Sequence, residues 1–198
     1  MMLWMRARRL WTLAAGGGLY LLAMTVLGDG GVVLPSLSAG SPPATPLALF
    51  LPLINCLVLL FCLGNRLLSA ELTGVRSVWR YDLAMVSATA VLSVLLGYAM
   101  SELLGFGAAA STGRNLLFLC GLMLLARGFA GERGAGAVPV VWLILVTLFG
   151  YGDAFAPRPW TVVAMPPGDG LAWAASLLVF GAGLGMLARG GRSGPAYR

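Results

Sequence analysis

The chain has 198 residues, of which 59% are hydrophobic and only 10% are charged. Soluble domains carry about 25% charged residues, and a soluble fold of this length has no core large enough for so much apolar surface. The composition therefore excludes a soluble globular domain and predicts a protein of the lipid bilayer. Six spans of about 20 residues would use roughly 120 residues, which leaves no room for an additional soluble domain.

Two missing residue types restrict the chemistry further. All 13 basic residues are arginines, and the chain contains neither lysine nor histidine. A Walker A loop needs its lysine against the nucleotide phosphates, and histidine-based acid–base catalysis or zinc binding is excluded as well. We therefore predict no enzyme, no cofactor and no metal. Cys56, Cys62 and Cys120 lie in apolar runs without a C-x-x-C pair, which favours small buried hydrophobes over a redox pair or metal site.

Six apolar runs predict the fold class, an all-α membrane protein built as a six-transmembrane-helix bundle in one domain, residues 1–198. The first run follows Arg6, Arg8 and Arg9, but it is long for a signal peptide and no clean A-x-A site follows it, so we expect a retained helix. The predicted spans are residues 10–28, 47–64, 83–106, 114–129, 138–152 and 171–187.

The arginines predict the orientation. With the N-terminus inside, the inner segments hold 11 of the 13 arginines, and the outer segments hold only Arg114 and Arg158. Positive charge is retained on the cytoplasmic side, so both termini are expected there, in a multi-pass protein of the bacterial inner (plasma) membrane. The arginines are spread along the inner rim, where anionic membrane lipids attract them. Nucleic acid, which needs one basic patch with aromatics, is not expected as a partner.

The longest inner segment, residues 65–82, is the predicted place for a partner to dock. Its apolar residues recur at helical spacing, which predicts a short helix along the membrane surface. The bland alternative is an interfacial anchor that only joins two spans. The predicted docking residues are Glu71, Arg76, Trp79 and Arg80.

This layout resembles the permease subunits of ABC-2 type exporters. In that family, the loop after the second span is the coupling helix, often with a glutamate a few residues before a glycine; Glu71 and Gly74 in AELTG are similar, although Thr73 precedes the glycine rather than following it. The family also places a re-entrant or short helical segment between its last two spans. The outer segment 153–170 has the length and the prolines for this, but it lacks the family's frequent Asn-Pro. The segment is either a lid over a path or a simple amphipathic loop.

Few polar residues lie within the spans. Asn55 needs a hydrogen-bond partner in hydrocarbon, either another helix or a substrate. Glu102 and Arg114 flank a short outer loop, where an ion pair is expected; if they face the bundle instead, they become candidates for a translocation path or gate. The small-xxx-small pairs Ser93–Gly97 and Gly181–Gly185 predict close helix packing within the chain before a dimer interface.

The function that these observations favour is a membrane-spanning permease subunit of an ATP-driven transporter. The expected partners are a separate cytoplasmic ATPase subunit and a second permease, in a homodimer or heterodimer. Two alternatives remain open: the substrate-binding membrane subunit of an energy-coupling-factor importer, and a non-transporting structural or assembly subunit. An intramembrane enzyme is least favoured, because the acids lie at or near the span ends.

Overall fold

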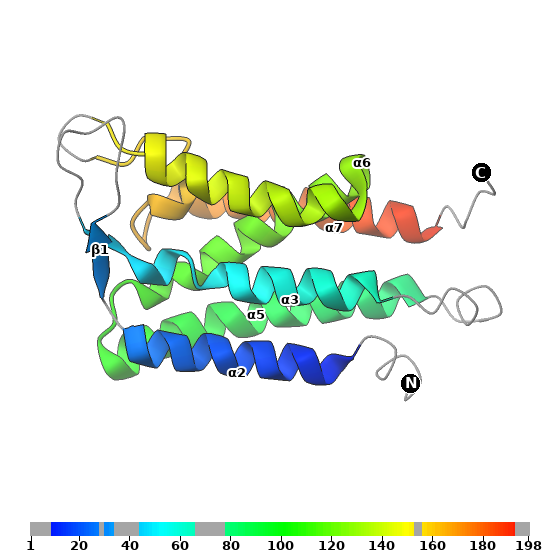
Figure 1. The fold of residues 1–198 in the computed structure, drawn as a ribbon, viewed down its shortest axis with the longest axis horizontal. Coiled ribbons are helices and arrows are strands. Elements are labelled where there is room, and N and C mark those ends of the chain that lie inside the picture. The colour runs from blue at the N-terminus through cyan, green and yellow to red at the C-terminus, as the bar shows by residue number, and fades with distance from the viewer. Residues whose placement is uncertain (1–8, 28–29, 34–43, 66–77, 153–155, 193–198) are drawn as a thin grey trace.

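The computed structural model describes residues 9–27, 30–33, 44–65, 78–152 and 156–192. Its helices lie side by side along one long axis, with a small antiparallel hairpin at one end (Figure 1). The elements in chain order are α2 (Leu10–Leu27), β1 (Gly31–Val33), β2 (Ala44–Pro46), the 3₁₀-helix η1 (Leu47–Leu49), α3 (Pro52–Gly64), α5 (Val78–Leu104), α6 (Ala109–Phe149), the 3₁₀-helix η3 (Val162–Ala164) and α7 (Gly170–Arg192).

The predicted helical membrane protein is confirmed at this level of detail. Within the described residues, four helical stretches are long and apolar enough to cross a bilayer, and α2 supplies a shorter apolar helix, Trp11–Leu27. The outward faces of the bundle are apolar: Leu103 is 81% exposed, and Leu171 and Val26 are almost as exposed. Such faces are unfavourable in water and suit contact with lipid. The four long stretches are Leu47–Gly64, Trp79–Leu104, Ala109–Phe149 and Gly170–Gly190.

Helix α6 doubles back on itself at Gly131. This glycine has φ 71° and ψ −165°, a conformation that interrupts the helix and that other residues avoid. Phe118 and Trp142 lie 24 residues apart and would be about 36 Å apart along a straight helix, yet their ring centroids are 5.5 Å apart. Figure 1 shows the two halves of α6 forming a helical hairpin.

The hairpin corrects the predicted boundaries of two spans. We expected an inner loop between residues 129 and 138, and the structure continues as helix on both sides of Gly131. The glycines and charges of this stretch lower its hydropathy, but a helical backbone still satisfies its own hydrogen bonds. Helix α6 also begins at Ala109 rather than 114, and α5 begins at Val78 rather than 83.

The first half of α6 is the central helix of the bundle. Every residue from 109 to 121 is buried, so this segment has neighbours on all sides. It packs against α3, α5 and α7, and Tyr20 of α2 reaches it through a hydrogen bond to Thr112. A helix buried all round is the core element of such a fold.

Glycines let the neighbouring helices approach the central helix at backbone distance. A methyl group added at Gly113 would collide with the backbone of Val94 on α5, and one added at Gly121 would lie 2.6 Å from the carbonyl carbon of Val179 on α7. A methyl group at Gly97 would lie 2.7 Å from the Ala109 carbonyl oxygen, which confirms the packing role predicted for Ser93–Gly97.

The prediction for the second small-residue pair was wrong. Neither Gly181 nor Gly185 has a neighbour that an added methyl group would meet within 4 Å, and Gly183 makes the contact with the central helix instead. The motif gave the correct helix, α7, but the wrong helical face.

The two ends of the bundle differ in charge. The start of α2, the end of α3, the start of α5, the turn at Gly131 and the end of α7 lie at one end, which we call the Arg127 end (Figure 1). The described arginines there are Arg9, Arg80, Arg127, Arg133, Arg189 and Arg192. The opposite end, the Arg114 end, has two described arginines, Arg114 and Arg158.

Candidate functional site

A cluster of buried polar side chains lies in the first turns of the central helix, at the Arg114 end. Thr112, Arg114 and Asn115 are polar, yet all three are 0% exposed, because they lie in the most enclosed part of the bundle. The Tyr20 hydroxyl donates to Thr112 Oγ1 at 2.7 Å, and Thr112 in turn donates to the Ala109 carbonyl oxygen. Buried polar groups in such a setting need partners, and each of these has one.

Arg114 binds the backbone of the proline-rich segment, residues 156–169, which lies between the last two long helical segments. Its Nη1 donates to the Pro166 carbonyl oxygen at 2.6 Å, and its Nη2 donates to the Met165 carbonyl oxygen at 2.7 Å. Its Nε and Nη2 also approach Asn115 Oδ1 at 3.4 and 3.3 Å. The guanidinium therefore fastens this segment to the central helix.

Asn115 completes the attachment. Its Nδ2 donates to the Val163 carbonyl oxygen at 3.0 Å, while its Oδ1 orients the Arg114 guanidinium. Val162 and Val163 of η3 are buried in the same core. Together, the two side chains hold three backbone carbonyls of the proline-rich segment.

The local sequence explains why these carbonyls are available. The chain turns after α6 through the hydrogen bonds Gly152 N to Ala156 O and Arg158 N to Gly150 O. Pro166 and Pro167 lack N–H groups and cannot continue a helix or a strand, so neighbouring carbonyls need other donors. Trp173 Nε1 donates to the Pro167 carbonyl oxygen, and Asp169 caps α7 by accepting the Ala172 N–H at 2.8 Å.

The predicted ion pair between Glu102 and Arg114 is not formed. Glu102 is exposed near the end of α5, whereas Arg114 lies within α6 and bonds to carbonyls and an amide. The sequence predicts Arg114 as the outermost residue of the span 114–129; because α6 begins at Ala109 instead, Arg114 lies within the helix and in the core.

An aromatic group lies beside this cluster. Phe118, one turn beyond Asn115, packs against Trp142, and Trp142 meets Trp160 of the proline-rich segment edge-on at 5.9 Å between centroids. The buried Trp142 Nε1 has no hydrogen-bond partner among the described residues. The three rings pack together where the two halves of α6 meet the proline-rich segment.

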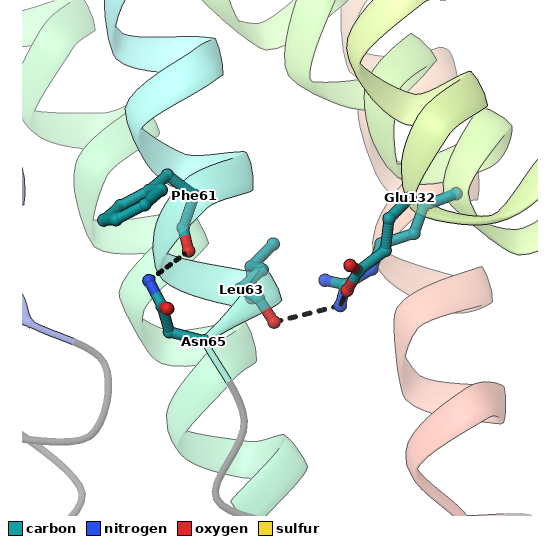
Figure 2. Close-up of polar contacts among 5 residues, drawn as sticks. Phe61, Leu63, Asn65 and Glu132 are labelled. Atoms are coloured by element: carbon teal, nitrogen blue, oxygen red, sulfur yellow. Dashed lines mark hydrogen bonds and ion pairs between the residues drawn. The ribbon is translucent and has the colours of Figure 1, made fainter.

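The Arg127 end holds a second polar junction, shown in Figure 2. Arg127 Nη2 donates to the Leu63 carbonyl oxygen at 2.9 Å and pairs with Glu132 Oε1 at 3.1 Å. Asn65 Nδ2 returns to the Phe61 carbonyl oxygen at 2.9 Å. A guanidinium at a helix C-terminus satisfies free carbonyls and opposes the negative end of the dipole, so Arg127 ties the end of α3 to the turn of the α6 hairpin.

The predicted docking residues fall partly outside the described residues, which exclude 66–77 and therefore Glu71 and Arg76. Trp79 and Arg80 lie in the first turn of α5, with the Arg80 guanidinium carbon 5.6 Å from the Trp79 ring centroid. The predicted inner helix 65–82 is thus corrected at its end, because residues 78–82 belong to α5. Apolar residues continue the helical pattern from this turn into the bundle.

Asn55 is buried on α3 with 4% of its surface exposed. The helix–helix hydrogen bond predicted for its amide is not formed with any residue that the structure describes. Its role as a path residue stays a prediction.

Sequence reasoning singled out Arg114 but missed Tyr20, Thr112 and Asn115. The available signal was the pair of adjacent polar residues, Arg114-Asn115, between an alanine-rich stretch and the apolar run from Leu116.

Comparison of the chain with protein-family models, curated protein sequences and solved structures gives no match.

Proposed function

We propose that this protein is a six-span permease subunit of an ATP-driven transporter, with both termini on the cytoplasmic side of a bacterial inner membrane. The observation that carries the proposal is the proline-rich segment between the last two helical segments, which is anchored in the bundle by its buried residues 161–163. Val162 and Val163 pack into the core, and Arg114 and Asn115 hold the segment's carbonyls.

The count of six spans rests on the α6 hairpin. Taken separately, its two halves join α2, α3, α5 and α7 as six helical segments. An even number of crossings returns the chain to the side where it began. This agrees with Figure 1, where the start of α2 and the end of α7 lie at the same end of the bundle. The excess of arginines at the Arg127 end supports a cytoplasmic location for that end by the positive-inside rule.

The resemblance to ABC-2 type permeases supports the transport role. Such permeases place a coupling loop after the second span and a re-entrant segment between the last two spans. Here, residues 66–77 connect α3 to α5 at the arginine-rich end, and the proline-rich segment folds into the opposite end. These two features lie at opposite membrane faces in the proposed orientation, as an ATP-coupled cycle requires.

The translocation path lies outside this chain's own core. Residues 109–121 of the central helix are buried, and glycines bring α5 and α7 into backbone contact with it. We therefore place the path between two copies, or between this chain and a second permease. Glu102, exposed near the outer end of α5, is available to such a path, whereas Arg114 positions the proline-rich segment.

The ATPase subunit would dock on the cytoplasmic connection between α3 and α5, using Glu71, Arg76, Trp79 and Arg80. The Arg127 junction fixes the end of α3 from which this connection departs. ATP-driven movement of the connection would thus reach α3 and the α6 hairpin together.

Co-purification tests the proposal. The tagged chain, extracted in mild detergent from its native membrane, should bring down an ATPase subunit. Reconstitution of that subunit with this chain in liposomes should stimulate its ATP hydrolysis. The double change Trp79→Ala/Arg80→Ala should weaken the association at least about tenfold, since interface aromatic and arginine side chains often dominate binding. Arg158→Ala, at the opposite end of the bundle, serves as the matched control. If the wild-type chain brings down no ATPase, the proposal is wrong.

A structural or assembly subunit is the second candidate, and the filled core favours it. The central helix is enclosed by the chain's own side chains, as expected of a packing module. This role predicts that the chain co-purifies in a larger membrane complex without an ATPase, and that Trp79→Ala/Arg80→Ala leaves the complex intact.

A further inference from the structure

Three sulfur-bearing side chains meet where α3 crosses the central helix. Cys56 projects from α3, while Cys120 and Met123 lie about one turn apart on α6 and so share a face. All three residues are 0% exposed. The Cys56 thiol donates to Met123 Sδ at 3.6 Å, and Cys56, Cys120 and Met123 belong to the same buried cluster of the core.

The spacing of the Cys56 and Met123 sulfurs suits a metal ion. A metal–thiolate bond of about 2.3 Å places two ligand sulfurs about 3.8 to 4.0 Å apart in tetrahedral or trigonal geometry. The 3.6 Å between Cys56 Sγ and Met123 Sδ is only a few tenths of an ångström shorter. An ion would therefore fit after small side-chain adjustments, without separation of the two helices.

The ligand set selects a soft ion. Thiolate and thioether sulfur favour Cu(I) over harder cations. Among the described residues, no three His, Cys, Asp or Glu side chains converge on one point, so the usual four-ligand zinc set is absent there. The site is enclosed by buried apolar residues such as Leu59, Leu116 and Leu119, which exclude the water and oxygen ligands that harder ions prefer.

We propose that Cys56, Cys120 and Met123 bind one Cu(I) ion between α3 and α6. Each Cu(I) that binds replaces one thiol proton, which passes to solvent, so that a Cu–S bond forms, an S–H bond is lost and the net charge of the core is unchanged. This balance matters because an uncompensated charge in the bilayer interior is costly. The second cysteine and the methionine complete the coordination. The site uses neither the Arg114 cluster nor the Arg127 junction and stands independently of the transport proposal.

Cys62 supplies a matched control on the same helix. It is also 0% exposed, and its side chain contacts Thr12 Oγ1 of α2 at 3.4 Å. A metal response that depends on Cys56 and Cys120, but not on Cys62, would report this site rather than general thiol chemistry.

The test is a titration of the full-length chain in detergent with Cu(I), under anaerobic reducing conditions, against a chromophoric Cu(I) chelator. We expect one equivalent to bind, and Cys56→Ala or Cys120→Ala to weaken binding at least about tenfold, the loss typical even for supporting residues of metal sites. Met123→Leu, which keeps the apolar volume, should weaken it less, and Cys62→Ala should not change it. X-ray absorption of the loaded chain should show sulfur neighbours at about 2.3 Å.

Two outcomes would overturn the proposal. One is that the wild-type chain holds no more Cu(I) than Cys56→Ala/Cys120→Ala; the other is that Cys62→Ala loses as much binding as either single variant. Gel filtration and thermal unfolding of each apo variant establish that it is folded. If a cysteine variant does not fold, Met123→Leu still decides the question, because an unchanged Cu(I) affinity in that variant would contradict the assignment.

Discussion

The first half of α6 carries one arginine near each end of the bundle, and the two arginines are stabilised in different ways. Arg114 is wholly buried and donates to two backbone carbonyls and one amide. Arg127, 13 residues later, retains 12% side-chain exposure and pairs with Glu132, whose side chain is 60% exposed. The charge of Arg114 is solvated only by buried protein groups, whereas Arg127 pairs with a carboxylate that is itself exposed to water.

This difference indicates different energetic roles. A buried guanidinium must recover a large desolvation cost, and removing it leaves its buried acceptors without donors. An exposed ion pair gains little, because water and salt screen it. We therefore expect substitutions at the Arg114 end to change the structure of the proline-rich segment, and those at the Glu132 pair to change stability only slightly.

The largest effect is expected for Arg114→Met. Methionine keeps the apolar stem but leaves the part-buried Met165 and Pro166 carbonyls without their donor. A fully buried group would cost about 1 to 3 kcal/mol, and each of these carbonyls should cost no more than that. Thermal unfolding in detergent should fall accordingly, and the proline-rich segment should become sensitive to protease. Glu102→Gln is the control, since that residue is exposed and is not bonded to Arg114. Equal stability of Arg114→Met and wild type would show that the segment is held by Val162 and Val163 alone.

An intermediate effect is expected at the turn of the α6 hairpin. Gly131→Ala places a Cβ at φ 71° and ψ −165°, a region essentially restricted to glycine, which costs about 1 to 3 kcal/mol for another residue. Since nothing lies within 4 Å of the added methyl group, the cost is a backbone effect alone. Gly181→Ala on α7 is the matched control, because it is equally open but helical, and alanine there should stabilise by up to about 1 kcal/mol.

The opposite ranking of these two glycine variants would mean that the hairpin turn is not formed in the membrane. Helix α6 would then be a single long helix, and the difference between its two ends would need a new explanation. Stability of both variants measured in the same detergent separates these cases.

The sequence was sufficient for the apolar helices but not for the way in which they meet. Hydropathy located α2, α3, α5 and α7, because lipid solvation imposes long apolar runs. It missed the helical turn at Gly131, since a low-hydropathy stretch between two apolar runs is equally compatible with a loop. It also placed Arg114 outside the core, because charge alone does not reveal that proline-rich backbone will supply carbonyl acceptors.

The remaining features depend on contacts between distant residues. Cys56 and Cys120 are separated by 64 positions, and no local pattern indicates that they pack in the same part of the core. Gly183, rather than the Gly181–Gly185 pair, meets Gly121, because the rotation of α7 is set by packing against the whole central helix. Spacing rules identify the face of an isolated helix, and the partner decides which face is used.

The smallest effect is expected for Glu132→Gln. This change removes the charge partner of Arg127 but keeps its size, and the Arg127 bond to the Leu63 carbonyl remains available. Exposed pairs typically contribute about 0.2 to 1 kcal/mol, and the 60% exposure of Glu132 favours the lower part of that range. Because exposed pairs are screened by salt, the difference from wild type should disappear when unfolding is repeated at about 1 M salt. A salt-independent loss as large as that of Arg114→Met would instead mean that the Arg127 junction is as desolvated as the Arg114 cluster, and the contrast between the two ends would no longer hold.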